Sequence, residues 1–224
     1  MGNKTKVIVL GGKGTAVNVA EGIYDADRNY NADVEFIGFA FDDETIGDSI
    51  NGFPVLCKTT EVFEKYQKFS DVKFIFQMYH QDKMLERAEL IRSYKIPGEK
   101  WYTFVHPSSF VSKSVKLGFG NVVYAHCAIH SNTIIGNHNM FSAFTSIGHD
   151  CIINNHVFTA THVCIGSSVK LDDCTFIGQN VGIRGNVSIA THNIIGIGAN
   201  VVSDIIETNG VYIGNPTKKV KSII

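Results

Sequence analysis

Two adjacent residues of the sequence, His149 and Asp150, combine a titratable imidazole with a carboxylate. A carboxylate bonded to one ring nitrogen fixes the tautomer of a neutral imidazole, and it stabilises the imidazolium that forms when the other nitrogen takes a proton. The pair could therefore serve as a general base. A surface histidine beside a turn aspartate would have the same sequence, and the residue types alone leave both interpretations open.

A glycine-rich segment near the N-terminus could bind phosphate groups. Gly11, Gly12 and Gly14 surround Lys13 directly after the apolar residues 7–10. A glycine turn between a strand and a helix lets the backbone approach a diphosphate at the start of the helix. Such a turn also serves NAD, but an NAD enzyme needs a catalytic domain for hydride transfer, which the rest of the sequence does not obviously provide. We expect Gly12 and Gly14 to contact a substrate that carries a nucleotide.

An acidic pair, Asp42 and Asp43, follows the second apolar run of the chain, residues 34–41. A carboxylate at the end of a strand can hydrogen-bond the nucleoside of a bound nucleotide. The alternative is a solvated acidic turn, and the sequence favours neither. Both residues are therefore candidate contacts to the same substrate.

Residues 1–104 alternate between apolar runs and amphipathic stretches. We expect strands over residues 6–10, 34–41 and 72–76, and helices over residues 15–24 and 81–94. Alternation of strands and helices at this spacing predicts a small parallel sheet of the Rossmann kind.

From Val111 onward the sequence repeats every six residues. A large apolar side chain occupies every sixth position from Val111 to Val201, and Thr159 is the one exception. A period of six held over so long a stretch is typical of a hexapeptide parallel β-helix, because neither an α-helix nor an ordinary sheet keeps that phase. Three hexads make one triangular coil, so the run predicts about five coils. We therefore assign residues 105–213 to a β-helix and residues 214–224 to a C-terminal tail.

Seven of the nine histidines lie in this repeat. Five of them share one position, three residues after the large apolar residue, whose other occupants include Gly, Asn and Asp: His126, His138, His156, His162 and His192. Those residue types tolerate a positive φ, so we interpret the five as corner residues of the coil. His149 lies one position earlier, where a corner requires nothing of it. No two neighbouring histidines of the repeat have the five-residue spacing of zinc-binding β-helix enzymes of the γ-carbonic anhydrase class, so no metal is expected.

Composition restricts the classes of partner. A formal net charge of −1 gives no basic surface for nucleic acid. There is no run of 18 apolar residues, so no membrane span is expected. The five cysteines form no CxxC motif and no export signal is recognisable, which favours reduced thiols in a cytoplasm.

Together these segments resemble the bacterial sugar acetyltransferases of the sialic-acid O-acetyltransferase and bacillosamine N-acetyltransferase group. The resemblance spans the chain, through the glycine turn, the acidic pair, Gly52-Phe53-Pro54-Val55, Phe104-Val105-His106-Pro107-Ser108, Gly148-His149-Asp150-Cys151 and Gly214-Asn215-Pro216-Thr217-Lys218. It implies a left-handed β-helix, a homotrimer, and acetyl-CoA lying between neighbouring β-helices. It also implies a catalytic histidine and acidic partner at His149 and Asp150, and an acceptor gripped by the N-terminal domain. The chain departs from the group at Thr15, where a histidine is frequent, and at Gln77-Met78-Tyr79-His80, which replaces a Gly-Asn pair.

The resemblance implies an acetyl-CoA-dependent N-acetyltransferase that acts on a nucleotide-linked amino sugar, in particular a 4-amino sugar, in cell-surface glycan biosynthesis. O-acetylation of a sugar hydroxyl and a non-catalytic nucleotide-sugar-binding protein are the alternatives. A backbone N–H near Gly166 or Ser167 could stabilise the tetrahedral oxyanion. We expect acetyl-CoA to contact Gly166, Ser167 and Gly185. Lys218, past the last hexad, could meet the CoA phosphates or belong to a solvated tail.

Overall fold

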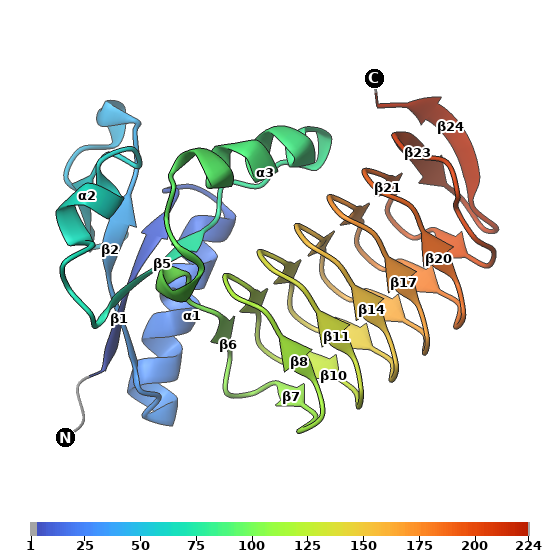
Figure 1. The fold of residues 1–224 in the computed structure, drawn as a ribbon, viewed down its shortest axis with the longest axis horizontal. Helices are drawn as coiled ribbons and strands as arrows, with labels where there is room; N and C mark the ends of the chain where they lie inside the picture. Colours follow the sequence, from blue (N-terminus) through green and yellow to red (C-terminus); the bar gives the residue numbers. More distant parts are fainter. Residues whose placement is uncertain (1–3, 224) are drawn as a thin grey trace.

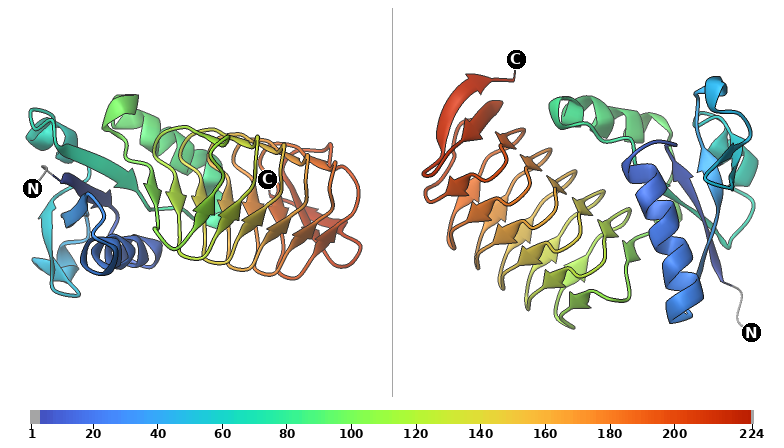
Figure 2. Two further views of the ribbon diagram at one scale, coloured as in Figure 1. Left: turned by 90° about the horizontal axis from the view of Figure 1, so that it is seen from below. Right: turned by 180° about the vertical axis from the view of Figure 1, so that it is seen from behind.

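The computed structural model describes residues 4–223 and consists of an α/β unit followed by a long prism of short parallel strands (Figure 1). The α/β unit lies at one end of the prism, and a C-terminal hairpin lies at the other (Figures 1 and 2). In this part of the chain, no helix is both long and apolar enough to cross a membrane.

The α/β unit is built on a five-stranded sheet of order β3-β4-β2-β1-β5. Strands β4, β2, β1 and β5 are parallel, and β3 is antiparallel to β4. The elements are β1 (Thr5–Leu10), α1 (Thr15–Tyr30), β2 (Val34–Ala40), a 3₁₀ turn η1 (Glu44–Ile46), β3 (Ser49–Ile50), β4 (Phe53–Cys57), α2 (Val62–Tyr66), β5 (Val72–Phe76), η2 (Gln81–Lys83), α3 (Met84–Ser93) and η3 (Gly98–Lys100).

The predicted strands 6–10, 34–41 and 72–76 agree with β1, β2 and β5 to within one residue. The helix predicted over residues 15–24 continues to Tyr30, and the one predicted over residues 81–94 begins with a 3₁₀ turn before α3. Strands β3 and β4 and helix α2 were not predicted, because each is too short to show a period.

Both faces of this sheet are covered. Side chains alternate across a strand, so Val7 and Val9 pack with α1 while Ile8 and Leu10 pack with α2 and the C-terminal part of α3. Residues 7–10 are fully buried as a result. This burial fixes the β1–α1 turn rigidly at the carboxyl end of β1.

The prism is a β-helix of two-residue strands. They are β6 (Phe104–Val105), β7 (Phe110–Val111), β8 (Lys116–Leu117), β9 (Val122–Val123), β10 (Ala128–Ile129), β11 (Ile134–Ile135), β12 (Met140–Phe141), β13 (Ser146–Ile147), β14 (Ile152–Ile153), β15 (Phe158–Thr159), β16 (Cys164–Ile165), β17 (Lys170–Leu171), β18 (Phe176–Ile177), β19 (Gly182–Ile183), β20 (Ser188–Ile189), β21 (Ile194–Ile195) and β22 (Asn200–Val201). A hairpin of β23 (Gly210–Ile213) and β24 (Lys218–Ser222) closes the end.

Three sheets form the faces of the prism, and all their strands are parallel except the terminal β24, which is consistent with a left-handed β-helix. We call them the β7 face (β7, β10, β13, β16, β19, β22), the β8 face (β8, β11, β14, β17, β20) and the β6 face (β6, β9, β12, β15, β18, β21, β23, β24). Strands pair with a shift of 18 residues, as three hexads per coil require. The register ends after Val201, since Ile189 bridges Ile205 instead of residue 207.

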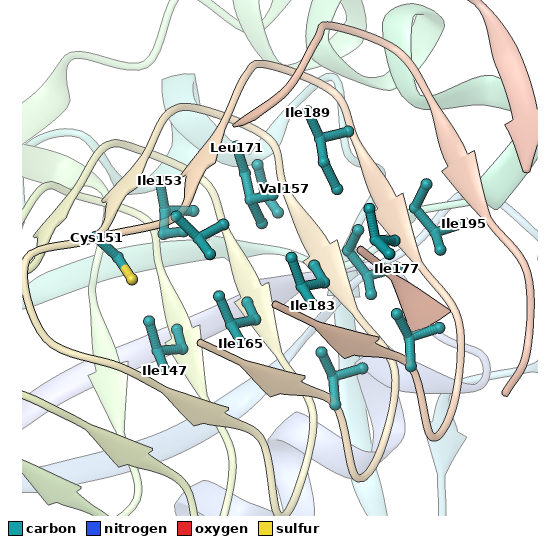
Figure 3. Packing of buried hydrophobic residues seen from close by; sticks show 14 of the residues in the cluster. Ile147, Cys151, Ile153, Val157, Ile165, Leu171, Ile177, Ile183, Ile189 and Ile195 are labelled. Atoms are coloured by element: carbon teal, nitrogen blue, oxygen red, sulfur yellow. The ribbon is translucent and has the colours of Figure 1, made fainter. Parts of the chain in front are cut away.

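The predicted column of large residues fills the interior of the prism. Figure 3 shows Ile147, Ile165 and Ile183 stacked on one face and Ile153 and Leu171 on another, all pointing inward. Thr159 is also fully buried, and its hydroxyl lies 3.0 Å from that of Thr145. The exception in the apolar column is therefore paired with a second polar side chain.

The corner positions have the predicted backbone conformation. All five histidines assigned to corners have φ between 55° and 60°. The register imposes the same conformation on Phe144, Ser168 and Cys174, whose residue types gave no such indication.

The α/β unit packs on part of the β6 face and on the corner between the β8 and β6 faces. The Tyr79 hydroxyl donates a hydrogen bond to the His138 carbonyl at 2.7 Å, and the Tyr124 hydroxyl donates to the Thr15 carbonyl at 3.0 Å. Met84 and Ala88 of α3 pack on Cys174.

Candidate active site

The His149 ring and the Asp150 carboxylate form a pair at the corner between the β7 and β8 faces. Nδ1 of His149 lies 2.5 Å from Oδ2 of Asp150, and both side chains are about half exposed. An ionised carboxylate only accepts, so Nδ1 carries the proton and Nε2 keeps its lone pair. The arrangement therefore presents an unprotonated ring nitrogen away from the carboxylate.

Asp150 is positioned by the coil itself. Its φ of 59° places it at the corner, and its backbone N–H donates to the Ser131 carbonyl at 2.9 Å. Asn132, one coil earlier, donates from Nδ2 to the second carboxylate oxygen at 3.0 Å. The hydrogen bond from His149, together with that from Asn132, holds the pKa of Asp150 below its usual value. The carboxylate thus stays ionised beside the imidazole.

The next coils continue this corner. Ser168 N–H donates to the His149 carbonyl, and Asn186 N–H donates to the Ser167 carbonyl, each at 2.9 Å. The coils approach closely, because a Cβ added to Gly148 would lie 2.6 Å from the nitrogen of Ser167. The backbone of Gly185 also packs against that of Gly166. Gly166, Ser167 and Gly185 therefore lie on the same edge as His149.

Gly12 and Gly14 line a cavity of about 540 Å³ at the β1–α1 turn. Gly14 has a φ of 54° and precedes α1, whose first turn receives no side-chain cap. A Cβ at Gly12 would lie 2.5 Å from the Phe41 ring, so only glycine fits that position. Gln77 and Met78, from the segment where the chain departs from the group it resembles, also line the cavity, and so does Arg87, which the sequence did not identify. Gln77 and Met78 follow β5, the strand beside β1, and the carboxyl ends of adjacent parallel strands are where α/β sheets bind ligands.

The two acidic residues after β2 have different surroundings. The carboxylate of Asp42 accepts the backbone N–H of Thr59 at 2.9 Å and its hydroxyl at 2.7 Å. Asp43 pairs with Lys13 at 2.6 Å and accepts hydrogen bonds from Thr45, and these contacts, led by Lys13, lower its pKa to about 2. Asp43 lines a different cavity of about 290 Å³, which shares Phe41 with the cavity of Gly12 and Gly14, whereas Asp42 borders neither cavity.

The structure does not bring all candidate residues together within one chain. His149 lies at the corner opposite the β6 face, while the cavity of Gly12 and Gly14 lies in the unit that packs on that face. Lys218 is an exposed residue of β24, at the end of the β6 face. Across residues 4–223, no group of three or more His, Cys, Asp or Glu side chains could hold a metal ion.

Solved structures with the same fold include two acetyltransferases. A histidine-to-asparagine variant of perosamine N-acetyltransferase from Caulobacter crescentus, in complex with CoA and GDP-perosamine, superposes with a TM-score of 0.82 over 97% of each chain at 22% identity. The acetyltransferase domain of PglB from Neisseria gonorrhoeae, in complex with acetyl coenzyme A, superposes with a TM-score of 0.82 over 97% of this chain and 100% of that chain, also at 22% identity. The chain has the fold of these acetyltransferases.

WeeI from Acinetobacter baumannii superposes with a TM-score of 0.77 over 96% of this chain and 100% of its own, at 20% identity. No family model matches the sequence, and a search of curated proteins finds no match. The similarity therefore lies in the fold, and it extends from the α/β unit through the C-terminal hairpin.

Proposed function

We propose that this protein is an acetyl-CoA-dependent N-acetyltransferase of a nucleotide-linked amino sugar, with His149 as its general base. The observation that carries the proposal is the His149–Asp150 hydrogen bond on an edge of a β-helix whose whole fold matches such enzymes. The α/β unit, residues 1–104, would then be a Rossmann-like domain for the nucleotide sugar, and residues 105–213 the acyltransferase domain. A role in cell-surface glycan biosynthesis fits an amino-sugar product.

His149 would act when the neutral acceptor amine attacks the thioester carbonyl. The new C–N bond forms as Nε2 takes the amine proton, and the C–S bond then breaks to release CoA, whose sulfur recovers that proton. Asp150 keeps Nδ1 protonated and stabilises the imidazolium between these two steps.

The tetrahedral oxyanion needs a donor beside His149, and Ser167 is the best placed. Gly166 N–H already donates to the Ile183 carbonyl, and Ser168 N–H donates to His149. Ser167 N–H has no backbone acceptor among the hydrogen bonds of residues 4–223, and it lies against Gly148. We assign the oxyanion contact to Ser167 and contacts to the pantetheine arm to Gly166 and Gly185.

A homotrimer is part of the proposal. The nucleotide cavity and His149 lie on different sides of the prism, so a complete site needs the cavity of one copy beside the His149 edge of the next. Acetyl-CoA would lie between two such β-helices. Lys218 is exposed and could meet the CoA phosphates, whereas Lys219 is paired with Glu207 at 2.7 Å.

Gly12, Gly14 and Asp43 would contact the acceptor directly. Asp42 would act through Thr59, because Thr59 engages both of its oxygens. We place the reaction in the cytoplasm, since Cys57, Cys127, Cys151, Cys164 and Cys174 are free thiols.

The test is a thiol-release assay with acetyl-CoA and a panel of UDP-, GDP- and dTDP-linked sugars. Each amino sugar is paired with the matching sugar that carries a hydroxyl at the same carbon. Turnover confined to the amino sugars supports N-acetylation, and turnover confined to the hydroxyl sugars indicates O-acetylation. Nucleotide-sugar binding without turnover would identify a binding protein and end the proposal.

A further inference from the structure

Basic side chains predominate over acidic ones in the cavity at the β1–α1 turn. Its lining includes Lys13, His80 and Arg87 and contains no carboxylate. The N-terminus of the 16-residue helix α1 opens beside it, and the dipole of a helix favours an anion at that end. The site is therefore built for a negatively charged group.

Arg87 is the cation in this cavity that lacks a partner. Lys13 is neutralised by Asp43 at 2.6 Å. Arg87 takes part in none of the ion pairs formed by residues 4–223. Its Nε is buried and has no hydrogen-bond acceptor in the same part of the chain. A guanidinium with an unsatisfied buried N–H binds phosphate with charge-assisted hydrogen bonds.

Gln77 supplies a second unsatisfied group in the same cavity. The residue is 2% exposed, and its Oε1 is buried without a donor among residues 4–223. The backbone holds the residue in place, since its N–H donates to the Leu10 carbonyl at 2.9 Å. A buried acceptor without a donor is unfavourable, so Oε1 is poised for an O–H or N–H of a ligand.

We infer that Arg87 binds the diphosphate of the acceptor and that Gln77 accepts a hydrogen bond from a hydroxyl or N–H next to it. The inference rests on the acetyl transfer proposed above and goes further, because it names the two side chains that bind the diphosphate part of the acceptor. The acceptor must be an ester of a nucleoside diphosphate, and an unphosphorylated amino sugar should enter the site poorly.

The decisive experiment measures binding and needs no turnover. UDP, GDP and dTDP are titrated by calorimetry into the wild-type protein and into Arg87→Ala, Arg87→Lys and Arg92→Ala. Arg92 is the matched control, because it is an exposed arginine of the same helix that does not line this cavity. For the nucleotide that binds best, Arg87→Ala should raise Kd by about tenfold or more. Lysine at position 87 should restore part of the affinity, and Arg92→Ala should change nothing.

Gln77→Met separates ligand recognition from a structural role. Methionine has a similar volume and removes the unsatisfied oxygen, so the variant should melt no lower than the wild type while nucleotide affinity falls. A lower melting temperature with unchanged affinity would show that Gln77 is structural.

Two results would overturn the inference: equal nucleotide affinity in the wild type and Arg87→Ala, or no nucleotide binding to the wild type. The same assays distinguish its failure from that of the proposed function. If the enzyme acetylates free amino sugars as efficiently as nucleotide-linked ones, acetyl transfer is supported and this inference is contradicted. A protein that binds nucleotide through Arg87 but releases no thiol from acetyl-CoA would support this inference and contradict the proposed acetyl transfer.

Discussion

Oδ2 of Asp150 lies 2.5 Å from Nδ1 of His149, and the backbone of Asp150 has a φ of 59°. Asparagine tolerates that conformation, so Asp150→Asn removes the charge and keeps the corner. A hydrogen bond to a charged group contributes about 1.5–3 kcal/mol, so kcat for acetyl transfer should fall by about 10- to 100-fold. Steady-state kinetics, with circular dichroism to confirm the fold, measure this effect. An unchanged kcat would remove Asp150 from the mechanism.

His149→Ala tests the base itself. Loss of a general base should lower kcat by roughly 10²–10⁴-fold, with KM for acetyl-CoA little changed. His149 is exposed and does not have a positive φ, so the melting temperature should be unaffected. His130→Ala is the matched control, since His130 is another exposed histidine of the repeat away from the corner position. Near-full activity in His149→Ala, measured by thiol release, would contradict the proposed role.

Mixed oligomers test whether one site uses two copies of the chain. His149→Ala lacks the proposed base, and Arg87→Ala lacks the proposed phosphate contact, so each variant alone should be poorly active. If the two residues act from different copies, co-assembled oligomers contain sites with both residues intact. Activity should then rise well above that of either variant, and a size-defined oligomer should be seen by sedimentation. Mixed oligomers that are no more active than either single variant would favour a site within one chain.

The sequence predicted the repeat domain better than the α/β unit, for a physical reason. Each hexad places two side chains inside the prism and one at a corner, so the type of Ile147 or His162 indicates where that residue lies. Phe144 and Cys174 show the limit, because the register forces them into corner conformations that their residue types do not indicate. Strands β3 and β4 have no comparable repetition.

The His149–Asp150 pair was predictable because its two members are adjacent, whereas the place of Arg87 in the cavity of the glycine turn was not. Arg87 reaches the β1–α1 turn only because α3 packs on the face of the sheet that carries Ile8 and Leu10, a relationship absent from any local pattern. Gln77 was noted only as part of a segment that departs from the group the chain resembles, and the sequence does not show that its side-chain oxygen is buried without a donor.

The Thr145–Thr159 pair predicts an asymmetry in stability. The Thr145 hydroxyl donates to the Ser142 carbonyl at 2.7 Å, so in the pair it accepts from Thr159. Thr145→Val would leave the Thr159 hydroxyl buried without an acceptor and should cost about 1–3 kcal/mol. Thr159→Val leaves the bond from Thr145 to Ser142 intact and should cost less, under about 1 kcal/mol. Urea unfolding of both variants checks the order, and equal or reversed costs would contradict the assignment of the donor.

The stacked rings of His138 and His156 predict acid sensitivity. The rings are parallel within 2° with centroids 5.4 Å apart, under α3 and Trp101. Burial, together with a smaller effect of the nearby His156, lowers the pKa of His138 to about 3. Burial also lowers the pKa of His156 to about 4, and there Asp173 raises the pKa while Arg92 lowers it. Both rings are therefore neutral in the folded protein at any pH near neutrality.

Because the folded-state pKa values lie below the ordinary value near 6.5, the unfolded chain binds more protons than the folded chain at acidic pH. The contribution of the two neutral rings to the free energy of unfolding is complete above pH 6.5. It is lost as the pH falls toward 4, at up to about 1.4 kcal/mol per pH unit for each histidine. Urea unfolding at pH 7.5, 5.5 and 4.5 measures that slope. The double variant His138→Asn/His156→Asn keeps residues that tolerate a positive φ and should reduce this dependence on pH. His126→Asn, at an exposed corner, should leave the dependence unchanged. A double variant as acid-sensitive as the wild type would assign the loss of stability to other groups.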